Sequence, residues 1–260
     1  MTLTTVDVRL EPPFAYVTMN RPEVKNALNQ QMVRDLSAAF ASLREDATIR
    51  AVVLSGAGGT FCAGGDLNEM RQAFSGSGGV PDYEYDFERL LIAVNTAPQV
   101  VVARVEGAAM GGGFGLVCVS DIAIASTQLV MGLPEVRLGI APAFISTYVA
   151  QRIGITRTRE LMLTGRRFTA EQAKEYGLVH DVIPFDVLDD HMTILLNDLR
   201  QCSPAAIRAC KALLTEIAGK PPEQTVEFRA KLLADLRAGD DAQEGIAAFM
   251  QKRTPKWSQA

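Results

Sequence analysis

The amino-acid sequence predicts an α/β protein made of stacked strand–strand–helix units and followed by a helical C-terminal region. Apolar strand-like runs and amphipathic segments alternate through the first half, so that the unit recurs about every 45 residues. Such a recurrence favours stacked turns of a right-handed superhelix. The competing fold is a doubly wound sheet, but the chain lacks its Gly-x-Gly-x-x-Gly fingerprint and downstream acid. Past Pro142 the pattern becomes mostly helical.

Composition sets the class of protein before any motif is considered. The chain has 260 residues, 48% of them hydrophobic and 22% charged, which is an ordinary globular balance. Its formal net charge of −4 gives no basic footprint for nucleic acid and no polybasic membrane segment. No apolar run is long enough to span a membrane, and the first ten residues carry Asp7 and Arg9 in place of an apolar signal segment.

Cysteine usage points to a reducing compartment. The four cysteines form no CxxC pair and lie in apolar or helical contexts, so we expect reduced thiols in a cytoplasmic protein. Histidines are scarce: His180 and His191 are the only two, and both are distant in sequence from the glycine-rich turns described below. A Ser-His-Asp or Cys-His nucleophile is therefore not expected, and no His/Cys/Asp/Glu set has the spacing of a metal site.

The first unit begins with a hairpin. Residues 3–10 and 14–19 alternate apolar and polar side chains and are separated by Glu11-Pro12-Pro13. Asn29 can cap a following helix, whose apolar positions recur at helical spacing. These positions are Met32, Val33, Leu36, Ala39, Phe40 and Leu43. Residues 51–55 form an apolar run typical of a buried strand.

The next units repeat this order. Residues 75–79 are rich in glycine and serine and predict a flexible surface loop. An amphipathic helix follows, with Phe87, Leu90, Leu91 and Val94 on one face, and a strand is predicted over 99–105. After a glycine-rich turn and a short apolar helical segment, residues 122–125 and 128–131 read as two further short strands.

The C-terminal part is predicted to be helical. Thr169 and Gln172 form a capping box and Gly177 ends that helix, after which residues 179–183 form a last strand. Helices are expected over about 185–201, 204–219, 222–238 and 240–252. The third of them carries an apolar stripe that favours a core or a subunit interface over a cofactor site. The stripe consists of Thr225, Phe228, Leu232, Leu233 and Leu236.

Three motifs carry the functional prediction. The stretch 107–115 (GAAMGGGFG) lies between an apolar strand and an apolar helical segment, where its glycines let backbone approach closely. The first N–H groups of that helix are unpaired and, with the helix dipole behind them, suit a developing negative charge. The stretch 61–67 (FCAGGDL) places a second small-residue turn after a strand, and 133–139 (LPEVRLG) supplies a carboxylate in an apolar setting.

Together these motifs resemble the crotonase (enoyl-CoA hydratase/isomerase) superfamily over nearly the whole chain. The resemblance implies a ββα superhelix, or spiral core, that binds an acyl-CoA thioester within residues 1–195. It further implies a C-terminal α-helical trimerisation region over 196–260, giving a homotrimer or a hexamer formed as a dimer of trimers. Coenzyme A would be part of the substrate, and no metal or redox cofactor is implied.

The family's chemistry requires two backbone donors and an acid/base group. Carried over by position, the donors are the N–H groups of Ala63 and Gly112, which would stabilise charge on the thioester oxygen. Hydratases of the family carry two glutamates, whose positions here are Gly115 and Glu135. Only Glu135 is present, and desolvation in an apolar pocket should raise its pKa. Cys62, next to Ala63, has no base partner and is expected to be a small packed residue.

A single glutamate at this position is the pattern of enoyl-CoA isomerases. The amino-acid sequence of residues 113–121 and 138–144, however, resembles that of isohexenylglutaconyl-CoA hydratases. Phe144 fills a turn that is glycine-rich in most relatives, which implies a different acyl pocket. Gly115 is expected to leave room for a branched or carboxylated acyl group. The resemblance therefore predicts an enoyl-CoA hydratase acting through an enolate. The alternatives are a double-bond isomerase that uses Glu135 alone and an acyl-CoA-binding protein with little catalysis.

The resemblance also assigns the residues that hold the substrate. A loop before the first helix and a C-terminal segment, often from a neighbouring subunit, would hold coenzyme A, and the two small-residue turns would hold the thioester. The expected binding residues are Lys25, Ala27, Leu28, Ala63, Asp66, Leu67, Gly111, Gly112, Gly115, Pro134, Phe144, Phe249 and Lys252.

Overall fold

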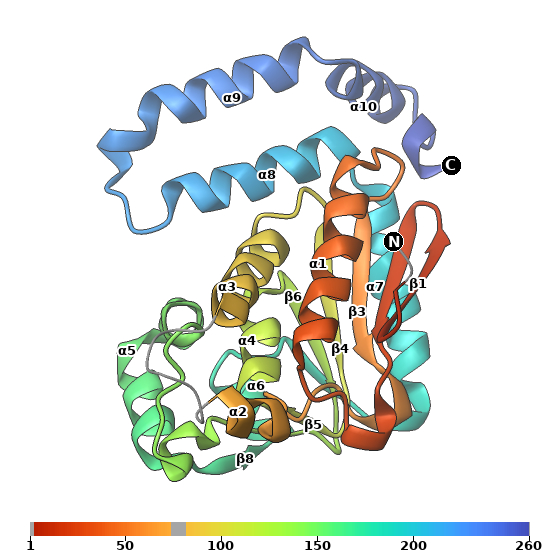
Figure 1. The fold of residues 1–260 in the computed structure, drawn as a ribbon. Coiled ribbons are helices and arrows are strands. Elements are labelled where there is room, and N and C mark those ends of the chain that lie inside the picture. The colour runs from red at the N-terminus through yellow and green to blue at the C-terminus, as the bar shows by residue number, and fades with distance from the viewer. Residues whose placement is uncertain (1–2, 74–81, 260) are drawn as a thin grey trace.

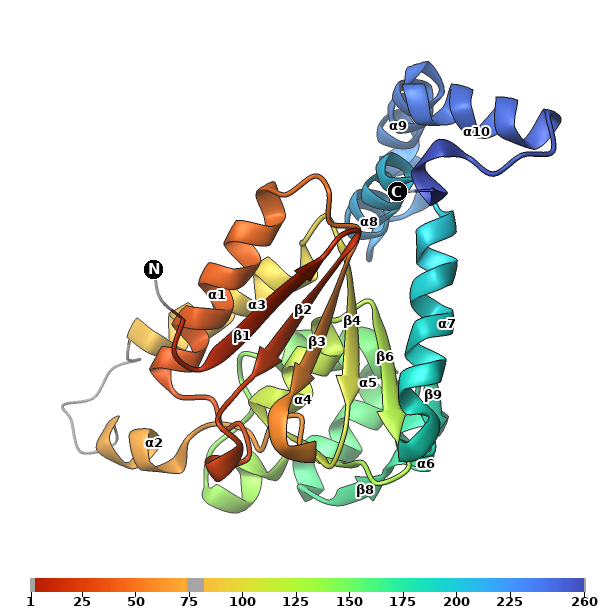
Figure 2. The ribbon, with the colours of Figure 1, turned by 90° about the vertical axis from the view of Figure 1, so that its right-hand side faces the viewer.

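The computed structural model describes residues 3–73 and 82–259, and the loop predicted at 75–79 lies outside them. A six-stranded sheet runs through the molecule in the order β1-β2-β3-β4-β6-β9, parallel except for the β1–β2 hairpin (Figure 2). Its strands are β1 (Val6–Glu11), β2 (Phe14–Met19), β3 (Ala51–Gly56), β4 (Val100–Val105), β6 (Ile122–Ser126) and β9 (Asp181–Ile183). The predicted hairpin and the predicted strand positions are confirmed.

A smaller sheet lies beside the large one. Its strands are β5 (Ala108–Met110), β7 (Val130–Gly132) and β8 (Arg167–Thr169), with β5–β7 parallel and β7–β8 antiparallel. The sequence analysis anticipated neither β5 nor β8. Each has only three residues, too few to show a period of two, so their pairing depends on tertiary context.

Helices cover both faces of the large sheet (Figure 2). On one face lie α1 (Gln30–Glu45), α3 (Asp82–Asn95) and α4 (Gly112–Val119), and on the other lies α7 (Leu188–Gln201). Asn29 caps α1 as predicted, since its side chain accepts a hydrogen bond of 2.8 Å from Met32 N. The remaining helices of the core are α2 (Leu67–Ala73), α5 (Ser146–Thr164) and α6 (Ala170–Glu175), the last of which begins with the predicted capping box.

Three C-terminal helices stand apart from this core (Figure 1). They are α8 (Pro204–Ile217), α9 (Val226–Ala238) and α10 (Asp240–Met250), each within a few residues of its predicted range. The boundary expected between residues 195 and 196 falls inside α7, whose Leu188, Met192 and Leu196 are buried against the large sheet. The helical appendage therefore begins after Gln201.

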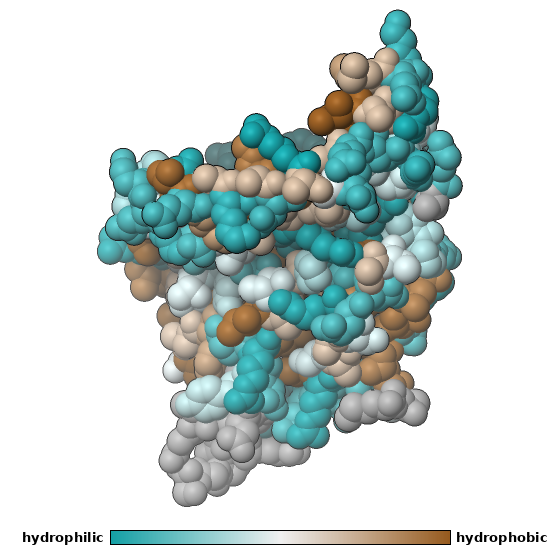
Figure 3. Space-filling model, turned by 90° about the horizontal axis from the view of Figure 1, so that it is seen from above, coloured by the Kyte–Doolittle hydropathy of each residue, from teal (hydrophilic) through white to brown (hydrophobic). Residues whose placement is uncertain are grey.

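Large apolar side chains project from the appendage. Seen from the side of α8–α10, hydrophobic and hydrophilic side chains are mixed across the surface (Figure 3). The exposed apolar residues of these helices are Leu214, Val226, Phe228, Leu233, Ile246, Phe249 and Met250. Within the described ranges, no helix is both long enough and apolar enough to cross a membrane.

Candidate active site

A cavity of about 590 Å³ opens where the two small-residue turns meet. Most of the predicted binding residues line it, and each belongs to one of the three motifs or to the segments next to them. These are Leu28, Ala63, Asp66, Leu67, Gly111, Gly112, Pro134, Glu135 and Phe144. Five predicted residues do not line it: Lys25, Ala27, Gly115, Phe249 and Lys252.

Backbone pairing brings the two turns together. Cys62 N donates to Ala108 O at 2.9 Å and Met110 N donates to Cys62 O at 3.0 Å, so the first turn pairs with β5. Gly64 lies against the backbone of Met110, where a Cβ would be 3.1 Å from the Met110 carbonyl oxygen. Gly111 has a φ of 48°, which glycine adopts without the strain of a side chain. The small residues are thus required by the close approach of two backbone segments.

The structure corrects one of the two predicted donors. The N–H of Ala63 donates to Lys25 O at 3.0 Å and is not available to a ligand. Two residues later, the N–H of Gly65 has no acceptor among the described residues, and Gly65 lines the cavity. The sequence analysis placed a donor at Ala63, whereas the structure leaves free the amide of Gly65 in the same turn, because residues 25–28 pair with the turn through the Ala63 N–H.

The second predicted donor has the expected geometry. Gly112 is the first residue of α4, so its N–H has no acceptor within the helix. No other acceptor for it is found in the part of the chain that the structure describes, and Gly112 lines the same cavity. A Cβ on Gly112 would lie 2.7 Å from Leu28 Cδ1, so a side chain here would crowd the cavity wall. Gly65 and Gly112 together offer two free N–H groups to one space.

Glu135 supplies the carboxylate of the cavity. It lies in a short 3-10 helix, Pro134–Leu138, that Pro134 begins. Its Oε2 atom is buried and has no hydrogen-bond partner among the described residues. Its Oε1 atom lies 2.7 Å from the position that a Cβ on Gly111 would take, so glycine at 111 allows the carboxylate to approach the turn. Burial raises the pKa of Glu135, opposed by a hydrogen bond with its own N–H.

Gly115 does not leave space for a ligand, contrary to the expectation from sequence. It is buried in α4, and a Cβ there would lie 2.3 Å from Ile145 Cγ2 and 3.1 Å from Ile145 Cβ. Ile145 itself is 3% exposed and lines the cavity. The volume that a second carboxylate would need is therefore occupied by a branched apolar side chain. At Gly115 the cavity therefore has an apolar wall and not additional room.

The other two carboxylates of the cavity are used to hold its wall. Asp66 Oδ2 lies 3.1 Å from Arg21 Nη2, and Asp66 Oδ1 accepts a 3.0 Å hydrogen bond from Asn68 N at the start of α2. Glu69 Oε2 accepts a 2.8 Å hydrogen bond from Gln30 N at the start of α1. Asp66 thus ties two loops together, which is a structural use of a residue predicted to bind coenzyme A.

Phe87, Ile145 and Arg167 are among the lining residues that sequence reasoning missed. Phe87 was assigned to a helix face and Ile145 to a filled turn. The packing of α3 against α4 places Phe87 at the cavity, and the packing of α5 against α4 places Ile145, the residue before α5, there. Arg167 carried no signal, because the strand β8 that positions it is too short to recognise. From the sequence alone, Arg166 and Arg167, which lie where the chain passes from α5 into β8, cannot be distinguished as to which faces the cavity.

Other chemistries find no support in the described residues. Burial raises the pKa of the Cys62 thiol to about 12, as expected of a packed thiol that does not act as a nucleophile. His180 accepts a hydrogen bond from Ala123 N at Nδ1 and joins two strands. Within residues 3–73 and 82–259 no group of three or more potential metal ligands is found.

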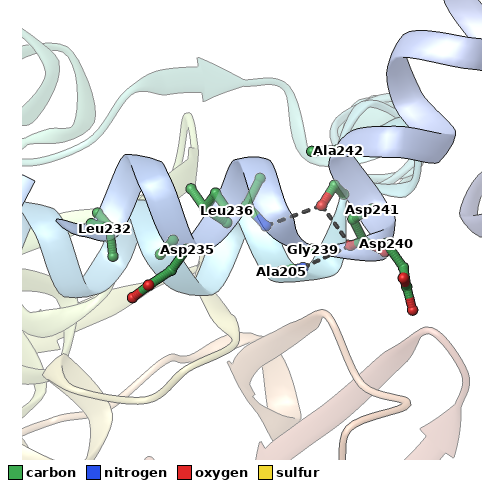
Figure 4. Close-up of a pocket in the computed structure, with 11 residues that line it drawn as sticks. Ala205, Leu232, Asp235, Leu236, Gly239, Asp240, Asp241 and Ala242 are labelled. Atoms are coloured by element: carbon green, nitrogen blue, oxygen red, sulfur yellow. Dashed lines mark hydrogen bonds between the residues drawn. The ribbon is translucent and has the colours of Figure 1, made fainter. Parts of the chain in front are cut away.

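A second hollow, of about 380 Å³, lies among α8, α9 and α10 (Figure 4). The carboxylate of Asp241 accepts hydrogen bonds from Ser203 Oγ at 2.7 Å and Ala205 N at 3.1 Å, and so joins α10 to the start of α8. The rest of its lining is mostly alanine, leucine and exposed acid. This hollow lacks the combination of free amides and a buried carboxylate found at Glu135.

Comparison with known proteins identifies the relatives of the chain. The family model described as enoyl-CoA hydratase/isomerase matches residues 11–260. Among curated proteins, the chain is similar to the 2,3-dehydroadipyl-CoA hydratase of Escherichia coli K12, with 32% identity over 92% of each chain. It is also similar to a Mycobacterium bovis protein named "Probable enoyl-CoA hydratase echA8", with 31% identity over 99% of each chain.

Solved structures give the same picture. The Pseudomonas aeruginosa protein AtuE superposes with a TM-score of 0.95 and 41% identity, covering 98% of this chain and 100% of that one. An enoyl-CoA hydratase/isomerase from Marinobacter aquaeolei superposes with a TM-score of 0.93 and 41% identity, covering 98% and 99%. The arrangement of the turns around Glu135 thus occurs within a fold that these proteins share.

Proposed function

The chain belongs to the enoyl-CoA hydratase/isomerase family, and on that premise we propose that it is an enoyl-CoA hydratase. One observation carries the proposal: the free N–H groups of Gly65 and Gly112 line the same cavity as Glu135, whose carboxylate has a buried Oε2 atom without a hydrogen-bond partner among the described residues. Two fixed donors can stabilise negative charge on a thioester oxygen. An adjacent carboxylate can move a proton at the neighbouring carbons.

The proposed reaction adds water across the C2=C3 bond of a 2-enoyl thioester. Glu135 takes a proton from water as the water oxygen bonds to C3, and the π electrons move to the thioester oxygen to form an enolate. The N–H groups of Gly65 and Gly112 stabilise this oxyanion, each by roughly 3 kcal/mol. Protonated Glu135 then delivers its proton to C2, which completes a syn addition. A carboxyl whose pKa is raised by burial is suited to both proton transfers near neutral pH.

A specific observation supports the runner-up, a double-bond isomerase. Ile145 occupies the space beside Gly115, so no carboxylate at position 115 can help to position water. In an isomerase Glu135 would remove a proton from C2 of a 3-enoyl thioester and return it to C4. The names of the similar curated proteins favour hydration. A third possibility, an acyl-CoA-binding protein with little catalysis, would leave the raised pKa of Glu135 without a role.

Some of the residues proposed to bind the coenzyme A half of the substrate lie outside the cavity. Leu28 and Leu67 line the cavity, while Lys25, three residues before Leu28, is exposed and in a left-handed conformation. Phe249 is 86% exposed on α10 and lines neither of the two cavities described above. We therefore assign Phe249 and Lys252 to the site of a neighbouring subunit in a homotrimer or hexamer. Cytoplasmic location remains a prediction, consistent with the four free cysteines.

The acyl chain is proposed to carry a carboxylate. One relative acts, by its name, on 2,3-dehydroadipyl-CoA, a thioester whose acyl chain ends in a carboxylate. In this chain the apolar wall of Phe87, Phe144 and Ile145 would pack against the carbon chain of such a substrate.

Product analysis tests the assignment. A hydratase consumes the conjugated absorbance of a 2-enoyl-CoA, whereas an isomerase creates that absorbance from a 3-enoyl-CoA. We expect loss of absorbance with the 2-enoyl substrate and a hydrated product of matching mass. Turnover of the 3-enoyl substrate alone would instead establish the isomerase, and tight binding without turnover of either would establish the binding protein.

A further inference from the structure

One arginine in the cavity has no role in the chemistry described so far. Arg167 is the only lysine or arginine that lines the cavity in the described part of the chain. Its guanidinium makes no hydrogen bond or ion pair with any residue in the ranges 3–73 and 82–259. The preceding Arg166, by contrast, lies 2.6 Å from Glu160 Oε1 and donates to the Tyr176 hydroxyl at 2.6 Å. Two adjacent arginines thus differ completely in how they are used.

Strand register directs the Arg167 side chain toward the cavity. Met110 pairs with Gly132, and Gly132 pairs with Arg167, so the three lie in one row across the small sheet. Residues that pair in this way have their side chains on the same face, and Met110 lines the cavity. The next residue, Phe168, faces the opposite side and is buried against Phe114.

Gly132, in the middle of this row, leaves space for the Arg167 side chain to cross the sheet. Gly132 has no side chain, and a Cβ there would lie 3.5 Å from Arg167 Cγ. The aliphatic part of Arg167 therefore passes over Gly132. A larger residue at 132 would occupy that space. The arrangement places a cation over the sheet on the same face as the catalytic turn.

The carboxylates of the cavity do not neutralise this cation. Asp66 is held by Arg21 and Asn68, and Glu69 is held by Gln30. Glu135 has its Oε2 unpartnered and buried, with no ion pair to Arg167. The guanidinium of Arg167, an exposed residue of β8, is therefore free to bind an anion that comes with the ligand.

The order of the strands indicates which part of the ligand this is. Leu28, in the segment proposed to hold coenzyme A, bridges to Gly65 at one side of the site, and Cys62 bridges to Ala109 in β5. Arg167 lies two strands beyond β5, about 10 Å from Met110 at the usual strand spacing. The cation thus lies across the catalytic turn from the coenzyme A segment, on the side open to the acyl chain.

We propose that Arg167 is a specificity-determining residue that binds a carboxylate on the acyl chain of the substrate. A guanidinium presents a fork of donors that matches a carboxylate with two parallel hydrogen bonds. The inference rests on the proposed acyl-CoA function but replaces the sequence-based idea that Gly115 makes room for a carboxylated chain. On this proposal, selectivity for a carboxylated acyl chain comes from the charge of Arg167 on β8 and not from free volume beside Gly115 in α4.

A matched pair of substrates tests the proposal. We would compare a 2-enedioyl-CoA, whose chain ends in a carboxylate, with its methyl ester, using wild type, Arg167→Gln and Arg159→Gln. Arg159 is an exposed arginine on α5 outside the cavity and serves as the control. Wild type and Arg159→Gln should prefer the carboxylate by roughly ten- to a hundredfold in kcat/KM, the range of a charge-assisted hydrogen bond. Arg167→Gln should lose this preference while its kcat/KM for the ester is unchanged.

Three results would overturn the proposal. Wild type could show no preference, or Arg167→Gln could slow both substrates equally, which would indicate a structural role. The loss in Arg167→Gln could also disappear with pantetheine thioesters of the same acid, which would mean that Arg167 binds a nucleotide phosphate.

A binding measurement separates this proposal from the proposed function. Calorimetry with a saturated dicarboxylic monothioester of coenzyme A and its methyl ester requires no turnover. If wild type binds the free acid more tightly and Arg167→Gln does not, the role of Arg167 stands even where hydration is not observed. Equal binding of both ligands by both proteins would end it.

Discussion

In the turns around Glu135, the proposed catalysis depends on the absence of side chains at several glycines, whereas in α8, α9 and α10 the proposed subunit contact depends on side chains that project from the surface. Carbons added at Gly111, Gly113 and Gly115 would meet other atoms at 2.7, 2.6 and 2.3 Å respectively. In the appendage, Phe249 and Met250 are 86% and 77% exposed. The core is complete within one chain, while the appendage presents apolar surface suited to a second copy.

The two regions are joined by a few polar contacts. Lys211 on α8 donates to Gln99 O at 2.7 Å and to Asp121 Oδ2 at 2.6 Å, Arg208 on α8 donates to Ala47 O at 2.9 Å, and Arg50 donates to the carbonyl oxygen of Trp257 beyond α10. Substitutions in the core should therefore act on catalysis and stability together. Substitutions at the tip of the appendage should act on association.

The largest effect is expected at Glu135. Glu135→Gln keeps the shape but removes the acid/base group, so kcat should fall by about 10²–10⁴-fold with little change in substrate affinity. The control is Glu227→Gln, an exposed carboxylate on α9, which should be neutral. Steady-state kinetics and calorimetry of both variants make the comparison. Activity of Glu135→Gln within tenfold of wild type would contradict the role of Glu135.

The packing of Gly115 against Ile145 gives the next largest effect. Gly115→Ala should destabilise the fold by about 1–3 kcal/mol, because its Cβ would overlap Ile145 Cγ2. In an Ile145→Ala background the same substitution should cost less, since that methyl group is gone. Chemical denaturation of the four proteins measures the coupling, expected at roughly 0.5–3 kcal/mol. Strictly additive effects would show that Ile145 does not fill the space at Gly115.

A substitution at Gly111 distinguishes the effect of backbone strain on stability from the effect of the Glu135 position on catalysis. Gly111→Ala should cost about 1–2 kcal/mol, because its φ of 48° suits glycine, and should also lower kcat by displacing the Glu135 carboxylate. Gly177→Ala is the matched control, with a φ of 78° and open space around it. Thermal unfolding and kinetics should show similar destabilisation in both variants but loss of activity only in Gly111→Ala. Equal activities would mean that Glu135 does not need the free space at 111.

Most of the secondary structure and the position of the acid could be predicted from the sequence, whereas the free amide and the space at Gly115 could not. The helices, the cap at Asn29 and the acid at Glu135 follow from periodicity, local capping chemistry and motif spacing. The free amide was placed at Ala63 and not at Gly65, because the difference depends on a backbone hydrogen bond to Lys25, thirty-eight positions away in the chain. Gly115 was expected to leave room for the acyl group. A glycine, however, indicates only that another atom packs closely against the backbone, and at Gly115 that atom belongs to Ile145.

A smaller effect is expected on the pH dependence of stability. The folded-state pKa of Glu135 is raised above its ordinary value of 4.5. The native state therefore holds this proton to higher pH than the unfolded state, and Glu135 lowers the free energy of unfolding as pH rises from about 4.5 through the folded-state pKa. The stability of Glu135→Gln relative to wild type should increase over that window. A pH-independent difference between the two proteins would contradict burial of the carboxylate.

The smallest effect on the single chain is expected at the tip of the appendage. Phe249→Ser should change the stability of the monomer by no more than about 0.5 kcal/mol, because the side chain is almost fully exposed. Sedimentation velocity should instead show weaker association of subunits, with Lys231→Ser on exposed α9 as the control. Unchanged association would remove Phe249 from the proposed subunit contact.

A crystal structure of Glu135→Gln with a bound 2-enoyl-CoA tests the central claim most directly. The account predicts that the thioester oxygen lies about 2.7–3.1 Å from the backbone nitrogens of both Gly65 and Gly112, with residue 135 beside C2 and C3 of the acyl chain. A thioester oxygen hydrogen-bonded elsewhere, or an Ala63 N–H released from Lys25 to bind it, would contradict the account.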